Sequence, residues 1–238
     1  MIKLAISGCQ GRMGARIMHL AQEDQDFEIS ALLEHRGHPG VGGQADNIEI
    51  KSEPEAIKGS NVLIEFTTPE ATLEHLAACV KYRTKMVIGT TGILPEQVRV
   101  IEAASKKIPI VFSSNMSVGV NILFKLLRDA AKATANYDVR IVEAHHVHKK
   151  DAPSGTAKTL AKIVEETSSN KVSDIKAIRE GEIIGDHDVI FESEVDILTL
   201  RHHAKTRDIF AKGALIAAKF VATQKKGLFN MQDVLGLK

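Results

Sequence analysis

The first 115 residues alternate between short apolar runs and stretches whose apolar residues recur at helical spacing. We expect buried strands at Ile2–Ser7, Phe27–Leu33, Val62–Phe66, Met86–Ile88 and Pro109–Phe112. We expect helices at Met13–Ala21, Pro69–Lys81 and Pro95–Lys106. Short buried strands that alternate with helices are typical of a parallel sheet covered on both faces. This part of the chain is therefore predicted to be a doubly wound α/β domain.

The pattern changes after residue 116. Helices are expected at Val118–Ala135, Ser154–Glu166 and Asp208–Thr223. Strands are expected at Val139–Ala144, Ile175–Arg179, Ile183–Phe191 and Val195–Arg201. The sequence thus predicts a doubly wound α/β domain at 1–116, a strand-rich second domain at 117–204, and C-terminal helices at 205–238 that return to the first domain.

Composition narrows the classes of partner. The chain has 31 Lys and Arg against 30 Asp and Glu, so it lacks the basic excess of a nucleic-acid binder. Aromatic residues are 4% with no Trp, which leaves few stacking platforms. No apolar run approaches the length of a membrane span or a secretory leader, and two cysteines form no disulfide framework. We expect a cytoplasmic protein that binds neither nucleic acid nor membranes.

A glycine-rich loop, Gly8–Gly14, follows the first predicted strand and opens the first predicted helix. Glycines allow a tight turn and a close approach of backbone amides to a pyrophosphate. The spacing is GxxGxxG rather than the commoner GxGxxG, and glycines alone also suit a simple strand–helix turn. Glu34 lies about 20 residues beyond Gly14, where an acid accepts hydrogen bonds from an adenosine ribose. This context favours dinucleotide binding.

Small polar residues follow two later predicted strands. They form the segments Gly89-Thr90-Thr91-Gly92 and Ser113-Ser114-Asn115. Ligands of doubly wound sheets lie outside the carboxyl ends of the strands, so these residues are candidates for contact with a nicotinamide and its ribose. Ordinary turn residues have the same composition, and spacing alone does not separate the two interpretations.

The segment Glu143–Ala157, with the sequence EAHHVHKKDAPSGTA, joins a predicted strand to a predicted helix. One interpretation is a metal site at His146 and His148, although the adjacent lysines and the lack of an acidic cluster disfavour it. A second is a solvated basic loop. Ser154-Gly155-Thr156 favours a third, because a helix N-terminus with two hydroxyls is suited to an anion. Cations beside such a site indicate a carboxylated substrate, with His and Lys as proton donors.

Together these segments resemble the dihydrodipicolinate reductase family, nicotinamide-dependent enzymes of the diaminopimelate and lysine pathway. The resemblance spans nearly the whole chain, and the pattern ExHHxxKxDxPSGTA at 143–157 is highly specific. It implies a Rossmann-type sheet domain, a second α+β domain for substrate binding and oligomerisation, and a homotetramer. The implied reaction is reduction of the dicarboxylate 4-hydroxy-tetrahydrodipicolinate to tetrahydrodipicolinate with NADH or NADPH.

The resemblance also implies roles for single residues. His145 and Lys149 would transfer protons, and His146, Gly155 and Thr156 would bind the substrate carboxylates. No metal ligand is implied. The cofactor contacts would be Gly8, Cys9, Gln10, Gly11, Arg12, Met13, Glu34, Gly89, Thr90, Thr91, Ser113, Ser114, Asn115 and Met116.

Three features depart from the family pattern. His35, followed by Arg36, stands where the family often has Arg, which affects the contact with NADP. Arg140 stands where many members carry an acid. The segment between the predicted helix Ser154–Glu166 and His202 is short. His202 and His203 are expected to form a structural pair, with a contribution to the same anionic pocket as the alternative. Two other functions share the expected fold: a dehydrogenase of semialdehydes or polyols, which would lack the anion site, and a non-enzymatic dinucleotide sensor, which would lack the proton donors.

Overall fold

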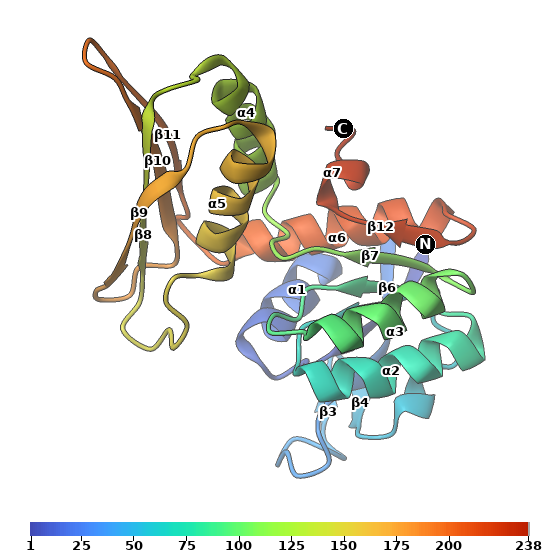
Figure 1. Ribbon diagram of the computed structural model, residues 1–238. Coiled ribbons are helices and arrows are strands. Elements are labelled where there is room, and N and C mark those ends of the chain that lie inside the picture. The colour runs from blue at the N-terminus through green and yellow to red at the C-terminus, as the bar shows by residue number, and fades with distance from the viewer. Residues whose placement is uncertain (238) are drawn as a thin grey trace. The chain divides into compact units, whose positions relative to one another are not determined.

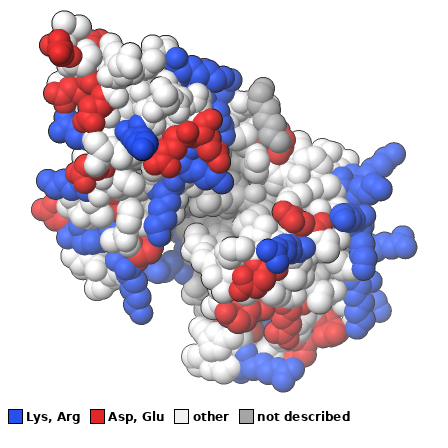
Figure 2. All heavy atoms as spheres, viewed as in Figure 1, with Lys and Arg blue, Asp and Glu red and all other residues white. Residues whose placement is uncertain are grey.

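The computed structural model describes residues 1–237, which form two compact units (Figure 1). Unit 1 contains Met1–Met116 and Asp208–Gly236, and unit 2 contains Ser117–Arg207. Each unit has its own sheet. On the face shown in Figure 2, acidic and basic side chains are interspersed in both units, in keeping with a net charge of +1. Across residues 1–237, no helix combines the length and apolar character needed to cross a membrane.

Unit 1 is built on an eight-stranded sheet with the order β12-β7-β6-β5-β1-β2-β4-β3. The strands are β1 (Ile2–Ser7), β2 (Phe27–Leu33), β3 (Gln44–Ala45), β4 (Ile48–Lys51), β5 (Val62–Glu65), β6 (Lys85–Ile88), β7 (Pro109–Phe112) and β12 (Gly227–Phe229). Neighbouring strands are parallel except for β3, which runs antiparallel to β4. The predicted doubly wound fold is confirmed, whereas the short strands β3, β4 and β12 were not predicted.

Helices cover both faces of this sheet. The core on one face includes α1 (Arg12–Gln22) and α6 (Asp208–Thr223), and the core on the other includes α2 (Pro69–Tyr82) and α3 (Pro95–Ser105). The alternation along β1 accounts for the two cores, because Leu4 and Ile6 belong to the first and Ala5 to the second. A 3₁₀ helix, η1 (Pro54–Ile57), and the short α7 (Met231–Val234) complete the unit.

Unit 2 has a four-stranded sheet with the order β11-β10-β8-β9. Its strands are β8 (Asp138–His145), β9 (Val172–Arg179), β10 (Asp186–Glu192) and β11 (Ile197–His203). The pair β8–β9 is parallel, and the other two pairs are antiparallel. Helices α4 (Val118–Ala133) and α5 (Gly155–Thr167) share a core with this sheet. The predicted second sheet domain is confirmed, but the strand expected from Ile183 begins at Asp186, after a turn at residues 181–182.

Candidate active site

The loop after β1 has a backbone shape that only glycines allow. Gly8 has a φ of +63°, in the left-handed region. A Cβ on Gly14 would lie 2.0 Å from the carbonyl oxygen of Gly8, so no side chain fits there. Gly11 precedes α1, and no side chain caps that helix. The amides of the first turn therefore remain available to a ligand, and they fit the pyrophosphate of a dinucleotide.

Glu34 lies against this glycine loop, as its position in the sequence predicts. Its Oε1 accepts a hydrogen bond from the backbone nitrogen of Gln10 at 2.8 Å. Cys9 is fully buried, and burial together with the charge of Glu34 raises the pKa of its thiol to about 11. The thiol therefore stays protonated and inside the core, which leaves only the backbone of Cys9 to face a ligand.

The residues after β6 lie at the same edge of the parallel sheet. The hydroxyl of Thr90 points into the protein, where it accepts a hydrogen bond from the Thr67 backbone nitrogen at 3.3 Å and bonds to the Thr72 hydroxyl at 2.8 Å. A Cβ on Gly89 would lie 2.2 Å from the ring of Phe66, so a close ring contact explains this glycine. Thr90 thus shapes the loop with its side chain, rather than offering that side chain to a ligand.

The residues after β7 form the third loop at this edge. The hydroxyl of Ser113 donates to the carbonyl oxygen of Asn115 at 3.0 Å, and Ser114 is exposed. Met116 is buried in the core that α6 shares, at 1% exposure. Its side chain therefore has a packing role, and only its backbone is available at the loop.

Strand β8 carries the histidine that the sequence singles out. Successive side chains of a strand point to opposite faces, so Val139, Ile141, Glu143 and His145 share one face, and all four are buried. The two aliphatic residues belong to the core of unit 2. The same face becomes polar at the carboxyl end of the strand, where Glu143 and His145 lie side by side.

The carboxylate of Glu143 is fully buried and saturated with donors. It accepts hydrogen bonds from His145 Nδ1 at 2.5 Å, from the backbone nitrogen of Ser154 at 3.1 Å, and from two Arg179 nitrogens at 2.8 and 3.0 Å. Burial raises its pKa, but Arg179 and His145 outweigh that effect and hold the pKa below its usual value. Since Nδ1 of His145 donates to this carboxylate, Nε2 is the atom left to exchange a proton with a ligand.

The pKa of His145 is lowered from its ordinary value of 6.5. Burial is the largest cause; Glu143 opposes it, and the charges of Lys149 and Arg179 add to it. The ring of His187 stands edge-on to that of His145 at 5.2 Å. Burial, followed by the charge of His145, lowers the pKa of His187 to about 3, so His187 is neutral at physiological pH.

Lys149 lies four residues after His145, just beyond a turn at residues 147–148. Its Nζ pairs with Asp151 at 2.8 Å, and its backbone nitrogen donates to the His146 carbonyl at 3.1 Å. The carbonyl of Asp151 accepts from Arg179 at 2.6 Å, which connects this turn to Glu143. Lys149 is therefore held close enough to act on His145 by its charge.

Helix α5 begins at an open end. The hydroxyl of Ser154 accepts from the backbone nitrogen of Ala157 at 3.1 Å and lies 3.3 Å from Nε2 of His187, so it serves as the cap. A Cβ placed on Gly155 would meet nothing within 4 Å. The hydroxyl of Ser154 is thus used within the protein, and the backbone amides of the first turn of α5 are the groups suited to an anion at this helix end.

The metal interpretation finds no support in this geometry. Strand β8 ends at His145, so His146 and His148 are not on one strand face, and their rings are 6.1 Å apart. Within residues 1–237, no three His, Cys, Asp or Glu side chains cluster in a way that could hold a metal ion.

Two residues whose roles the sequence left open, Arg140 and His203, form charged pairs on the sheet of unit 2. Arg140 pairs with Glu192 on β10, and with Asp138 at 3.6 Å. His203 Nδ1 lies 2.6 Å from Asp186 on the neighbouring strand. Both have structural partners outside the cluster around His145.

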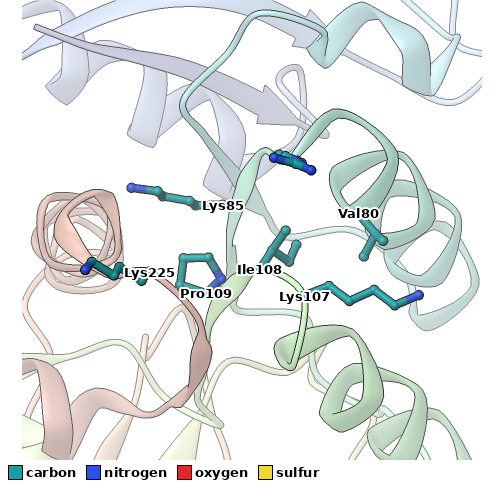
Figure 3. A pocket seen from close by; sticks show the side chains of 7 residues that line it. Val80, Lys85, Lys107, Ile108, Pro109 and Lys225 are labelled. Carbon is teal, nitrogen blue, oxygen red and sulfur yellow. The ribbon is translucent and has the colours of Figure 1, made fainter.

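A separate hollow lies near the amino ends of β6 and β7. It is lined by Val80, Arg83, Lys85, Lys107, Ile108, Pro109 and Lys225. In Figure 3, Lys107 points away from Lys85 and Lys225, so these cations do not converge on a common point. Doubly wound sheets bind ligands at the opposite, carboxyl ends of their strands. The hollow is therefore not part of the candidate site.

Comparison with known proteins decides the family. Residues 2–116 match the family model "Dihydrodipicolinate reductase, N-terminus", and residues 119–235 match its C-terminal counterpart. The chain belongs to the dihydrodipicolinate reductase family. The 4-hydroxy-tetrahydrodipicolinate reductase of Nitrosomonas eutropha is 44% identical across 100% of this chain and 99% of its own length. That of Geotalea uraniireducens is 40% identical, with 100% of both chains covered.

A solved structure agrees with the reductase fold. The dipicolinate-bound dihydrodipicolinate reductase from Paenisporosarcina sp. TG-14 superposes with a TM-score of 0.78 and 24% identity, over 98% of each chain. The resemblance inferred from the sequence motifs is thus confirmed at the level of the family and the fold. The alignment with the Nitrosomonas eutropha reductase runs over 266 positions, more than the 238 residues of this chain, so it contains gaps.

Three residues of the cluster around His145 were not singled out from the sequence: Glu143, Arg179, and His187, which lies opposite Glu143 on β10. Glu143 had a signal, because an acid two residues before a histidine on a strand shares its face. Arg179 had none, because it reaches Glu143 only through the parallel register that pairs His145 with Arg179 across β8 and β9. A pairing between residues so far apart in the chain cannot be seen in local pattern.

Proposed function

We propose that this chain reduces 4-hydroxy-tetrahydrodipicolinate to tetrahydrodipicolinate with NADH or NADPH, in the pathway to diaminopimelate and lysine. Family membership over the whole length supports this activity. The observation that carries it is the Glu143–His145 pair followed by the open N-terminus of α5, since one segment offers a proton-exchanging group and an anion site. Bound NADH or NADPH supplies the hydride.

Unit 1 holds the cofactor in this proposal. The backbone of Gly8–Met13 binds the pyrophosphate, and Glu34 binds the adenosine ribose. The loops Gly89–Thr91 and Ser113–Met116 contact the nicotinamide half. Support comes from the glycine-only shape of the first loop and from the common sheet edge on which all three loops lie.

His145 donates the proton that the reaction consumes. Loss of the 4-hydroxyl group as water gives an unsaturated cyclic imine. Hydride addition at C4 of this imine leaves an enamine, which takes up a proton at C3. Glu143 fixes the ring of His145 by its Nδ1 and leaves Nε2 to face the substrate. Because burial lowers the pKa of His145, its imidazolium is a stronger acid than a free one, which favours transfer to carbon.

The two substrate carboxylates are bound by His146, Gly155, Thr156 and Lys149. The helix N-terminus supplies amides and partial positive charge, and Lys149 supplies a full charge. Asp151 keeps the ammonium of Lys149 in place through their 2.8 Å contact. In this assignment Lys149 both binds a carboxylate and makes the nearby His145 a stronger acid.

The same proposal includes assembly into a homotetramer, with unit 2 as the oligomerisation domain. It also places the protein in the cytoplasm. Support for subunit contact comes from apolar side chains that β11 and its hairpin expose: Val195 at 91%, Ile197 at 62% and Leu198 at 38%. Light scattering is expected to give about four times the 25.9 kDa chain mass. A mass equal to one chain would contradict the assembly.

A coupled assay tests the activity. The upstream synthase generates the unstable substrate in place, and loss of NADH or NADPH absorbance is followed. We expect consumption that requires both this chain and the synthase product. Binding of NADH without any consumption would favour the dinucleotide sensor, and consumption of NADH with simple semialdehydes instead would favour the other dehydrogenase.

A further inference from the structure

A second buried carboxylate–histidine pair lies in unit 1, and the mechanism above does not use it. Glu65 is the last residue of β5 and is fully buried. Its carboxylate lies 2.6 Å from Nδ1 of His75 on α2 and accepts a 2.6 Å hydrogen bond from the hydroxyl of Ser7. The hydroxyl of Thr67 also donates to it.

These partners connect the carboxylate to two of the cofactor loops. Ser7 immediately precedes Gly8, and the methyl of Thr67 lies 3.0 Å from where a Cβ on Gly8 would be. The backbone nitrogen of Thr67 donates to the Thr90 hydroxyl, which also bonds to that of Thr72. The carboxylate of Glu65 thus bonds directly to the end of β1 and to the loop after β5, and it reaches the loop after β6 through Thr67.

Burying the Glu65–His75 pair costs free energy that a purely structural contact would not need to spend. A buried carboxylate needs a cation and several donors, and a hydrophobic pair of similar size stabilises a fold at least as well. Burial lowers the pKa of His75, but the hydrogen bond and charge of Glu65 outweigh it, with a contribution from Glu74, so the pKa is raised. What hydrophobic side chains cannot provide is directional bonds that fix neighbouring loops.

We propose that Glu65 and His75 are positioning residues that hold the loops after β1 and β6 in the shape that binds NADH and NADPH. They act through Ser7, Thr67 and Thr90 rather than by touching the cofactor. The inference rests on the proposed function in one respect, namely that unit 1 binds the cofactor. The pair then sets cofactor affinity and leaves substrate affinity alone.

The test is NADH titration of the full-length protein, followed by fluorescence. His75→Ala is expected to raise the Kd for NADH by roughly five- to hundredfold, the usual range of coupling between linked sites. His75→Asn is expected to restore most of the affinity, because its amide nitrogen replaces Nδ1 as the donor to Glu65. At saturating NADH, the KM for substrate is expected to stay at the wild-type value in both variants.

Thr84→Val is the matched control. Thr84 is also fully buried, but it precedes β6 at the amino end, where its hydroxyl donates to the carbonyl of Ser60 at 3.4 Å. It is expected to lower Tm without changing the Kd for NADH. If His75→Ala is too unstable to titrate, Glu65→Gln takes its place, because it removes the charge with little change in shape.

Three outcomes would overturn the proposal. His75→Ala, or Glu65→Gln in its place, could lower Tm and leave the Kd for NADH unchanged, as Thr84→Val does, or His75→Asn could bind as weakly as His75→Ala. Either result overturns the positioning role alone. Failure of the wild-type protein to bind NADH or NADPH would overturn the proposed function together with it.

Discussion

Two buried glutamate–histidine pairs, one in each unit, have nearly the same geometry and opposite titration behaviour. Glu65 and Glu143 are both fully buried, and their carboxylates lie 2.6 and 2.5 Å from Nδ1 of His75 and His145. Yet the pKa of His75 is raised and that of His145 is lowered, both relative to 6.5. Geometry alone therefore does not decide whether such a histidine keeps its proton.

The difference lies in what else shares the carboxylate. Burial lowers the pKa of either histidine, and at His75 the full charge of Glu65 outweighs it, since the other donors to Glu65 are neutral hydroxyls. Glu143 is already bound by Arg179 through two hydrogen bonds, and the positive charges nearby favour a neutral His145. A carboxylate that shares its charge with an arginine orients a histidine and still lets it release a proton.

The largest expected effect concerns the Glu143–His145 pair, whose histidine exchanges a proton with the substrate. His145→Gln is expected to lower kcat by about 10²–10⁴-fold with little change in KM, because a general acid is lost while the binding groups remain. Steady-state kinetics at several pH values measure this. His203→Gln is the control, since His203 pairs with Asp186 outside the site. A His145→Gln enzyme with near-normal kcat would remove this residue from the chemistry.

Lys149→Ala completes that experiment. It is expected to lower kcat and also to raise the KM for substrate, because Lys149 both acts on His145 and binds a carboxylate. The double variant is expected to be far less impaired than the product of the single effects, because groups that act as a unit are not additive. Fully multiplicative losses would mean that the two residues act independently.

A smaller effect is expected at the anion site beside the Glu143–His145 pair. Thr156→Val is expected to weaken substrate binding by about 1.5–3 kcal/mol, the worth of one hydrogen bond to a charged group. The KM for substrate and the Kd for NADH are measured together. Equal changes in the two would show that Thr156 serves the cofactor and not the substrate.

The two pairs also predict opposite pH dependences of stability. The raised pKa of His75 adds stability that is fully present below pH 6.5 and is lost as pH rises through its folded pKa. The lowered pKa of His145 adds stability that is present above pH 6.5 and is lost as pH falls through its folded pKa. Urea unfolding of wild type, His75→Asn and His145→Asn across this range measures both contributions. If the two contributions to stability both rose or both fell with increasing pH, the difference between the two pairs would be contradicted.

The smallest effect concerns cofactor choice. Glu34 suits a free ribose hydroxyl and repels a 2′-phosphate, whereas His35 and Arg36 partly offset that repulsion. We expect both cofactors to be used, with NADH equal or better. A preference for NADPH in kcat/KM beyond about a hundredfold, or about 2.7 kcal/mol, would contradict this role of Glu34.

The features that were predicted from the sequence are those that depend on the spacing of residues close together in the chain. Buried parallel strands read as apolar runs, and the glycine loop and the 143–157 segment carry their own spacing, so the fold and the position of His145 were expected. The short β12 has no such signal, and its pairing with β7 depends on a distant segment. Residues that act across the fold, such as Arg179 and the Glu65–His75 pair, depend on register and packing. For the same reason the inward turn of Thr90 and the pairing of Lys149 with Asp151 were not predicted.

The most direct test of the comparison is an NMR titration of the Cε1 protons of His75 and His145 in the wild-type protein and in Arg179→Gln. We expect His75 to titrate above 6.5 and His145 below it in the wild type. In Arg179→Gln the pKa of His145 is expected to rise, because Glu143 no longer shares its charge with a cation, while that of His75 stays where it was. Wild-type midpoints on the same side of 6.5, or a His145 pKa unmoved by the loss of Arg179, would contradict the account.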